Sequence, residues 1–307
     1  MTSARPVAEA VWRPGWAVDV GLTLAPLSHG SADPTYQAAP DGVLWRTALT
    51  PHGPGTLALW LAGAGEVHAQ AWGAGAEWLV AGLPDLLGGR DDVTGFDPRH
   101  PVPARVWRRH PGLRIPRTGL VWDALVPAVL EQRVTSTEAW RSWRELVCRF
   151  GAVAPGPTPA GMRVVPAPRV LADLPVWEWH RAGVDAKRRN TIRAAAGVAS
   201  RLAEAAEMAP EAALARLRVV PGIGPWTAAE VAQRAFGDAD AVSVGDYHIP
   251  SLVGMALVGE PLDDEGMLAE LAAYRPHRHR VVRLVEIGAP RIPRRAPRAP
   301  IRDYRAM

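Results

Sequence analysis

The feature that most constrains this chain is a glycine-containing hairpin between two helical runs. Leu214, Leu217 and Val220 have helical spacing and predict the end of one helix. Pro-Gly-Ile-Gly-Pro, residues 221–225, then interrupts that helix, because glycine reaches positive φ and proline cannot continue a helix. Pro225 suits the first turn of a second helix. The backbone N–H groups of such a hairpin face outward, where they bind phosphate without regard to sequence.

A carboxylate follows the hairpin about twenty residues later. Gly245-Asp246 precedes an apolar helical run that begins at Ile249. Beside a hairpin that holds a phosphate backbone, Asp246 is placed to face a sugar carbon and stabilise positive charge there. The alternative is that Asp246 only caps the following helix. Pro250 counts against a cap, since a cap at Asp246 would want an N–H four residues on, and we therefore favour catalysis.

Together these two segments resemble the helix-hairpin-helix DNA glycosylases, most of all the bacterial alkylpurine (3-methyladenine DNA glycosylase II) branch. The match is carried by Pro-Gly-Ile-Gly-Pro-Trp-Thr-Ala, 221–228, and Val-Gly-Asp-Tyr-His, 244–248. The resemblance implies a mainly α fold with a smaller α+β N-terminal domain. It also implies that the chain binds double-stranded DNA with a damaged base, flips that base and hydrolytically excises an alkylated purine.

The resemblance assigns roles to several side chains around the base. Asp246 would be the catalytic anion. Trp226 stands where some members of the superfamily have a lysine nucleophile, which favours simple hydrolysis over strand cleavage. Trp226 is also suited to stack on a flipped base, or to be a core residue between two helices. Glu230 and His277 stand where the best-known alkylpurine enzyme has a pocket tyrosine and tryptophan, and Tyr247 is a further pocket candidate.

A second set of residues is expected to contact DNA. The family turn that pushes a side chain into the minor groove corresponds to Leu-Glu-Gln-Arg-Val-Thr, 130–135, with Arg133 as the wedge or as a solvated surface arginine. The expected DNA-binding residues are Gly222, Ile223, Gly224, Thr227, Gln132, Arg133, Lys187 and His248. No metal or organic cofactor is expected, apart from a monovalent cation, Na⁺ or K⁺, at the backbone of Val219 and Ile223.

The chain is expected to contain two domains and a tail. Short strand-like runs at 17–24, 43–49, 56–62 and 67–71 predict an antiparallel sheet with one or two helices in an N-terminal domain, residues 1–108. The helical domain is expected at 109–288 and its helix-hairpin-helix at 211–236. Within it, residues 120–132 predict a helix, and Thr135-x-x-Glu138 predicts a capping box for the next. A basic Pro/Arg-rich tail would follow at 289–307.

Composition excludes several classes of protein. A single cysteine, Cys148, rules out an internal disulfide and the four-cysteine iron–sulfur cluster of other superfamily members. A net charge of +4 agrees with a polyanionic partner. No apolar run is long enough to span a membrane, and the first residues lack a signal-peptide core, so a monomer in the cytoplasm with the nucleoid is expected.

Two alternatives stay open beside the alkylpurine enzyme. One is a non-catalytic helix-hairpin-helix DNA-binding protein, because a Gly-x-Gly hairpin by itself also occurs in such modules. The other is a glycosylase for a different damaged base, since Glu230 and His277 depart from the family pocket. A combined glycosylase and lyase is disfavoured, because no primary amine follows the hairpin and Lys187 is the only lysine of the chain.

Overall fold

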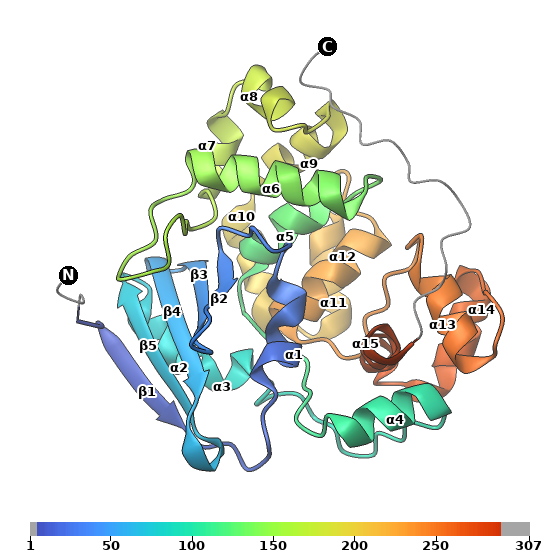
Figure 1. Cartoon of the computed structure of the whole chain (residues 1–307). Helices are drawn as coiled ribbons and strands as arrows, with labels where there is room; N and C mark the ends of the chain where they lie inside the picture. The colour runs from blue at the N-terminus through green and yellow to red at the C-terminus, as the bar shows by residue number, and fades with distance from the viewer. Residues whose placement is uncertain (1–4, 290–307) are drawn as a thin grey trace.

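A computed structural model describes residues 5–289 of the chain. The predicted basic tail lies outside these residues, apart from Ala289. Within the described part, helices dominate and one small sheet lies near the N-terminus, as expected (Figure 1). No helix there combines the length and the apolar character that crossing a bilayer requires.

The sheet has five strands, all antiparallel, in the order β1-β5-β4-β3-β2. The strands are β1 Ala8–Trp12, β2 Tyr36–Ala38, β3 Leu44–Thr50, β4 Gly53–Leu61 and β5 Val67–Gly73. Three of the four strand predictions are therefore confirmed. The fourth is wrong: residues 20–24 form helix α1, Val20–Leu24, because the Asp19 carboxylate accepts a hydrogen bond from Leu22 N at 2.9 Å and caps a helical turn.

Two short helices follow the sheet and pack on it. They are α2, Ala76–Ala81, and α3, Leu83–Leu86. Apolar residues of the sheet, α1, α2 and α3 make one core. The loop of residues 152–165 also lies against the sheet, since Thr47 Oγ1 donates to Arg163 O at 2.6 Å.

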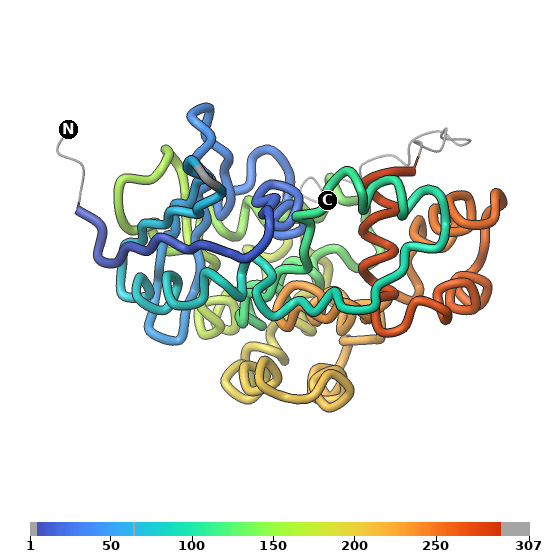
Figure 2. Tube along the Cα trace, turned by 90° about the horizontal axis from the view of Figure 1, so that it is seen from below, coloured from blue at the N-terminus to red at the C-terminus, as the bar shows by residue number. Residues whose placement is uncertain are grey.

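A helical core lies beside the sheet. Its centre is α5, Val121–Leu130, in which nearly every side chain is buried. Around it pack α6 Ser136–Phe150, α7 Pro168–Asp173, α8 Val176–Arg181, α9 Ala186–Ala196, α10 Ala199–Ala203, α11 Pro210–Arg218 and α12 Pro225–Val231, which continues as a π-helical turn, Ala232–Phe236. The predicted capping box at the start of α6 is confirmed. Figure 2 shows α10 and α11 (gold) standing out from one side of the molecule.

The last helices form a separate small core. They are α13 Ile249–Leu257, α14 Asp264–Leu271 and α15 Arg278–Gly288. Helix α4, Pro101–Arg109, packs against α15 through Val106 and Leu284 (Figure 1). A domain boundary at residue 108 would cut through α4, whose apolar side faces the C-terminal helices. Short 3₁₀ turns complete the fold at Ala25–Leu27, Gly63–Gly65, Glu204–Glu207 and Ala272–Tyr274.

Candidate active site

The turn between α11 and α12, residues 219–224, has the form of a helix-hairpin-helix. Gly222 has φ +91°, and a Cβ there would lie 2.0 Å from Thr191 Oγ1 of α9, so only glycine fits. Gly224 differs from our expectation of a positive φ. Its φ is −92°, and a Cβ would meet nothing within 4 Å. Gly222 therefore shapes the turn, whereas Gly224 leaves open space in front of the start of α12.

The corner after α5 lies directly on this hairpin. Gln132 Nε2 donates to Gly222 O at 3.0 Å and to Thr227 Oγ1 at 2.8 Å. Thr227 is buried, so its hydroxyl supports the corner from within. Arg133 is exposed and has φ +57°, the one positive φ of a non-glycine residue within 5–289. Such strain persists only where the surroundings impose it, and it turns Arg133 outward.

A buried arginine that the sequence analysis passed over holds this corner in place. Arg188 Nη1 donates to Leu130 O at 2.8 Å, at the C-terminal end of α5. Its Nε donates to Asp185 Oδ2 at 2.6 Å, and only 3% of the side chain is exposed. Lys187, the neighbouring residue, is exposed at the start of α9. Arg188 therefore has a structural role, whereas the exposed Lys187 side chain is accessible to a ligand.

Asp246 is held by three N–H groups. Its Oδ1 accepts hydrogen bonds from His248 N at 2.8 Å and Ile249 N at 3.0 Å, and its Oδ2 accepts from Trp226 Nε1 at 3.0 Å. The objection from Pro250 is wrong, because the N–H groups two and three residues on, not four, meet the carboxylate. Asp246 therefore caps α13 and still turns its second oxygen toward α12. The preceding turn is also fixed, since Gly245 N donates to Asp264 Oδ1 at 2.9 Å.

Trp226 and Glu230 lie one turn apart on α12. Trp226 is half-buried, with its indole N–H on Asp246, so it is not a core residue between helices. Glu230 is buried and paired: its Oε2 accepts from Arg234 Nη1 at 2.7 Å, and its Oε1 accepts from Ser243 Oγ. Gln233 Nε2 donates to the same Ser243 hydroxyl at 2.9 Å. The Glu230 carboxylate is thus fixed by partners on both of its oxygens.

Glu131 belongs to the same site, although the sequence analysis gave it no role. It follows the last residue of α5, and its pKa is raised, chiefly by burial. Arg234 lowers that pKa, while the negative charges of Glu230 and Asp246 raise it. These electrostatic interactions join carboxylates from three separate segments of the chain. The only sequence signal was its place beside Gln132 in the wedge turn.

The other two predicted pocket residues are Tyr247 and His277, and their surroundings differ. Tyr247 is 89% exposed and makes an edge contact with His248, which is also exposed. His277 packs edge-on against Phe96 at 5.2 Å between ring centroids, beside Arg280. His277 therefore lies apart from Asp246, whereas Tyr247 directly follows Asp246 and its side chain is exposed. Burial lowers the pKa of His279 well below the usual value, and the positive charges of Arg283 and Arg234 lower it further.

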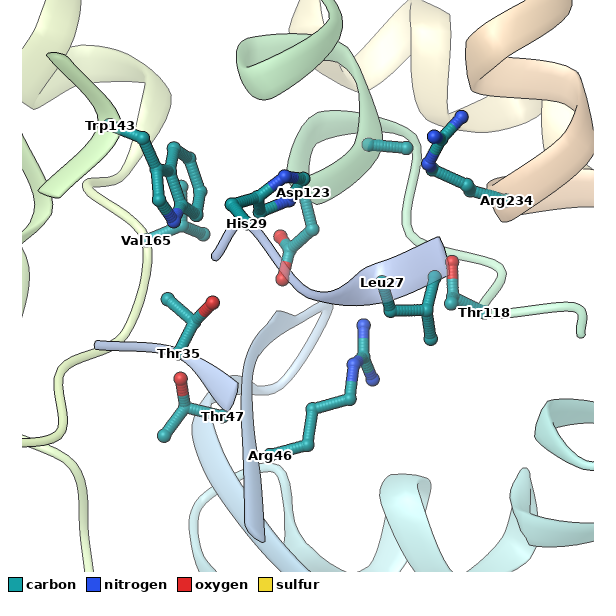
Figure 3. Close-up of a pocket in the computed structure, with 11 residues that line it drawn as sticks. Leu27, His29, Thr35, Arg46, Thr47, Thr118, Asp123, Trp143, Val165 and Arg234 are labelled. Atoms are coloured by element: carbon teal, nitrogen blue, oxygen red, sulfur yellow. The ribbon is translucent and has the colours of Figure 1, made fainter. Parts of the chain in front are cut away.

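A small cavity of about 30 Å³ separates the sheet from the helical core behind Arg234 (Figure 3). Arg46 enters it from β3, and 7% of this residue is exposed. Its guanidinium makes no hydrogen bond or ion pair within residues 5–289. Asp123, on the opposite wall, accepts from Leu49 N at 3.2 Å, while its buried Oδ1 accepts no hydrogen bond in the described part of the chain. Burial raises the pKa of Asp123 to about 7.

His29 connects this cavity to Glu131. The imidazole lines the cavity, and its Nδ1 lies 4.0 Å from Glu131 Oε1. Burial lowers the pKa of His29 to about 4, so the ring is neutral at neutral pH. The region around Glu131 and Arg234 is therefore a cluster of charged and polar groups from the 27–35 loop, β3, α5, α12 and the turn after it.

Solved structures with this arrangement of helices and sheet are DNA glycosylases. A 3-methyladenine DNA glycosylase from Archaeoglobus fulgidus superposes with a TM-score of 0.73 and 17% identity, over 90% of this chain and 97% of that one. An 8-oxoguanine glycosylase/lyase from Clostridium acetobutylicum in its apo form superposes with a TM-score of 0.71 and 11% identity, over 94% of this chain and 100% of that one. The chain has the helix-hairpin-helix DNA glycosylase fold.

Sequence comparison gives relatives whose name includes a DNA repair enzyme. A probable bifunctional transcriptional activator/DNA repair enzyme AlkA, found in two strains of Mycobacterium tuberculosis, is 30% identical over 169 residues, 55% of this chain. The chain spans about a third of the length of these relatives, 33%. No family model matches the chain. Within the glycosylase fold, the hairpin and Asp246 occupy the junction between the central helices and the C-terminal helices.

Proposed function

We propose that this protein is a monofunctional DNA glycosylase that flips and hydrolytically excises alkylated purines of the 3-methyladenine type. The observation that carries the proposal is the Asp246 carboxylate. Two backbone N–H groups and the Trp226 indole hold it in one orientation, next to a hairpin whose backbone suits phosphate binding. An anion that is already oriented stabilises a developing cation without the cost of reorganisation.

The proposed reaction begins with the DNA backbone on the hairpin. The exposed turn at Gly222 and the open space at Gly224 admit a phosphate to the N–H groups that begin α12. Arg133 enters the minor groove and occupies the gap that the flipped nucleotide leaves. Exposed Lys187 and His248 lie free to contact flanking phosphates.

Chemistry then takes place at the sugar. As the glycosidic bond breaks, positive charge grows on the sugar ring, and the Asp246 carboxylate stabilises it and orients the attacking water. An alkylated purine that already carries a positive charge leaves without acid help. The half-buried Trp226 ring offers the base a stacking surface. Because Trp226 carries no amine, no Schiff base forms there, and the product keeps an uncleaved strand.

A monovalent cation is proposed at the hairpin. Val219 is 77% exposed at the C-terminal end of α11, where helix carbonyls lack intrahelical partners and carry partial negative charge. The carbonyls of Val219 and Ile223 are of the type that Na⁺ or K⁺ accepts. Such an ion would supply positive charge beside the DNA phosphate. We place the protein as a monomer in the cytoplasm, with the nucleoid.

The proposal is tested by excision from methylated duplex DNA, with borohydride trapping in parallel. We expect free 3-methyladenine or 7-methylguanine and no protein–DNA adduct. DNA binding with neither product would select the competing function, a non-catalytic binding protein, which the hairpin alone would explain. A trapped adduct would mean a lyase and would contradict the role given to Trp226.

A further inference from the structure

The Glu131 carboxylate has no charged partner in contact, in contrast to that of Glu230. Its Oε1 accepts a hydrogen bond from Trp140 Nε1 at 3.2 Å and lies 4.0 Å from the neutral His29 ring. Its Oε2 has no hydrogen-bond partner among residues 5–289. The side chain keeps 23% of its surface exposed, so Glu131 lies at the surface of the site. Glu230 differs, because Arg234 and Ser243 occupy both of its oxygens.

Three charged side chains shift the pKa of Glu131, and they come from different segments of the chain. Arg234 in the turn after α12 is the one cation, and Glu230 on α12 already neutralises it by a direct ion pair. Asp246, before α13, adds a second negative charge. Burial and these two carboxylates together favour the protonated form of Glu131, so its pKa lies above the usual value. A protonated carboxyl is a proton donor.

We propose that Glu131 is the general acid that protonates the departing base, while the Asp246 carboxylate stabilises the sugar. This inference rests on the proposed glycosylase function and names a second catalytic residue for it. The corner that carries Glu131 is fixed by Gln132 on the hairpin and by Arg188 on Leu130, so its position relative to bound DNA is set. A partly exposed carboxyl that can donate a proton and a carboxylate held by three N–H groups supply the acid and the anion of this reaction.

The step balances without any further reactant. The glycosidic bond breaks and its electron pair passes to the base nitrogen, while a ring nitrogen of the base takes the proton of Glu131. Water adds its oxygen to the sugar carbon and releases a proton to solvent, and Glu131 regains a proton from solvent. The products are the free base and an abasic sugar.

The substrate class follows from this role. A cationic alkylpurine gains little from a proton donor, whereas a neutral damaged purine depends on one. The site is therefore built to remove neutral lesions as well as cationic ones. General acid catalysis typically contributes about a hundred- to ten-thousand-fold in rate, which sets the size of the effect.

The experiment compares two bases in otherwise identical duplexes, cationic 7-methylguanine and neutral hypoxanthine, under single-turnover conditions. Glu131→Gln keeps the size and hydrogen bonding of the side chain but has no acidic proton. We expect it to slow hypoxanthine release about a hundredfold or more and 7-methylguanine release less than about threefold. Glu265→Gln, an exposed change in the first turn of α14, is the matched control and should alter neither rate.

The pH profile separates chemistry from structure. Hypoxanthine release by the unaltered protein should fall as pH rises through the pKa of Glu131, and this fall should be absent in Glu131→Gln. Equal losses on both bases, no loss on hypoxanthine, or an unaltered protein that releases only 7-methylguanine would each overturn this inference and leave the proposed function standing. Release of neither base by the unaltered protein would overturn both.

Discussion

The hairpin and the cluster around Glu131 and Arg234 are built in opposite ways. The hairpin lies within one short stretch of chain, and the groups that it exposes to a ligand are backbone N–H groups. Its shape depends on Gly222, whose positive φ and contact with α9 exclude any side chain. The cluster around Glu131 and Arg234 is made of side chains from loops and helices that lie far apart in sequence; His29 and Arg234 alone are about two hundred residues apart.

This difference separates what the two regions recognise. Backbone N–H groups at a helix start meet any phosphate, so the hairpin gives affinity that does not depend on the base. Charged side chains in a half-buried recess respond to the charge and hydrogen-bonding groups of one base. Changes to the hairpin should therefore alter binding to all DNA, whereas changes to the cluster should alter the rate and choice of excision.

The largest effect is expected from Asp246→Asn, which removes the charge at the sugar. Excision should slow by about a hundred- to a thousand-fold, while DNA affinity stays within about twofold. Asn cannot accept from both Trp226 and the α13 backbone, so a small loss of thermal stability should accompany it. Asp263→Asn is the control, because the Asp263 carboxylate also accepts a backbone N–H at the start of a helix, from Gly266 N of α14 at 2.8 Å. Normal excision by Asp246→Asn would remove it as the catalytic residue.

The next effect is a pH dependence of stability that arises from Asp123, in the cavity between the sheet and the helical core. The pKa of Asp123 is about 7 in the folded protein and near 4 when unfolded, so the folded state binds the proton more tightly. Stability from this group is present at low pH and is lost as pH rises from about 4 to about 7, by on the order of a few kcal/mol.

Asp123→Asn should flatten this dependence. Its stability relative to the unaltered protein should rise across the same window, measured as denaturant midpoints at pH 4.5 and about pH 8. His29, whose pKa is lowered to about 4, acts in the opposite sense, so the comparison must be made against the variant. A constant difference at all pH values would show that Asp123 is not the titrating group.

A smaller effect separates the two hairpin glycines. Gly222→Ala forces a side chain to φ +91° and against Thr191, and should lower stability by about 1–3 kcal/mol. Gly224→Ala should stay within about 0.5 kcal/mol, because φ is −92° and the space is open. Thermal melting of both variants is the measurement. Equal losses would contradict the different roles assigned to these positions.

Gly224→Asp extends the comparison to binding. The new carboxylate would stand in front of the N–H groups that begin α12 and repel phosphate. Affinity for damaged and undamaged duplex should fall by the same factor, with little change in the melting temperature. A change only in the preference among damaged bases would show that the hairpin does not hold the backbone.

The smallest effect is expected at the wedge. Arg133→Ala should slow excision from a fully paired duplex by about tenfold, since flipping costs a few kcal/mol and the wedge stabilises only part of that change. The loss should disappear when the damaged base lies opposite a gap, where no partner base has to be separated. A loss of the same size on both substrates would mean that Arg133 only contacts phosphate.

The sequence by itself determined the elements whose geometry is local. Pro-Gly-Ile-Gly-Pro specified the hairpin, Thr135 and Glu138 specified a cap, and alternating apolar runs specified three strands, because each depends on φ, ψ and hydrogen bonds within a few residues. The sequence indicated only that Asp246 lies one helix after the hairpin, and the structure adds the hydrogen bond from Trp226 Nε1 to Asp246 Oδ2. Their catalytic roles stay predictions.

Only the tertiary structure decided the composition of the cluster around Glu131 and Arg234. His277 and His279 lie two residues apart on one stretch, and the rotation of α15 turns His277 toward Phe96 and brings His279 under the field of Arg234. His29 and Arg46 belong to no motif, and Glu131 had no role within the wedge turn. Their positions around the cavity depend on how the sheet packs against α5. Burial and electrostatic fields are sums over all neighbours in space, so no local pattern in the sequence specifies them.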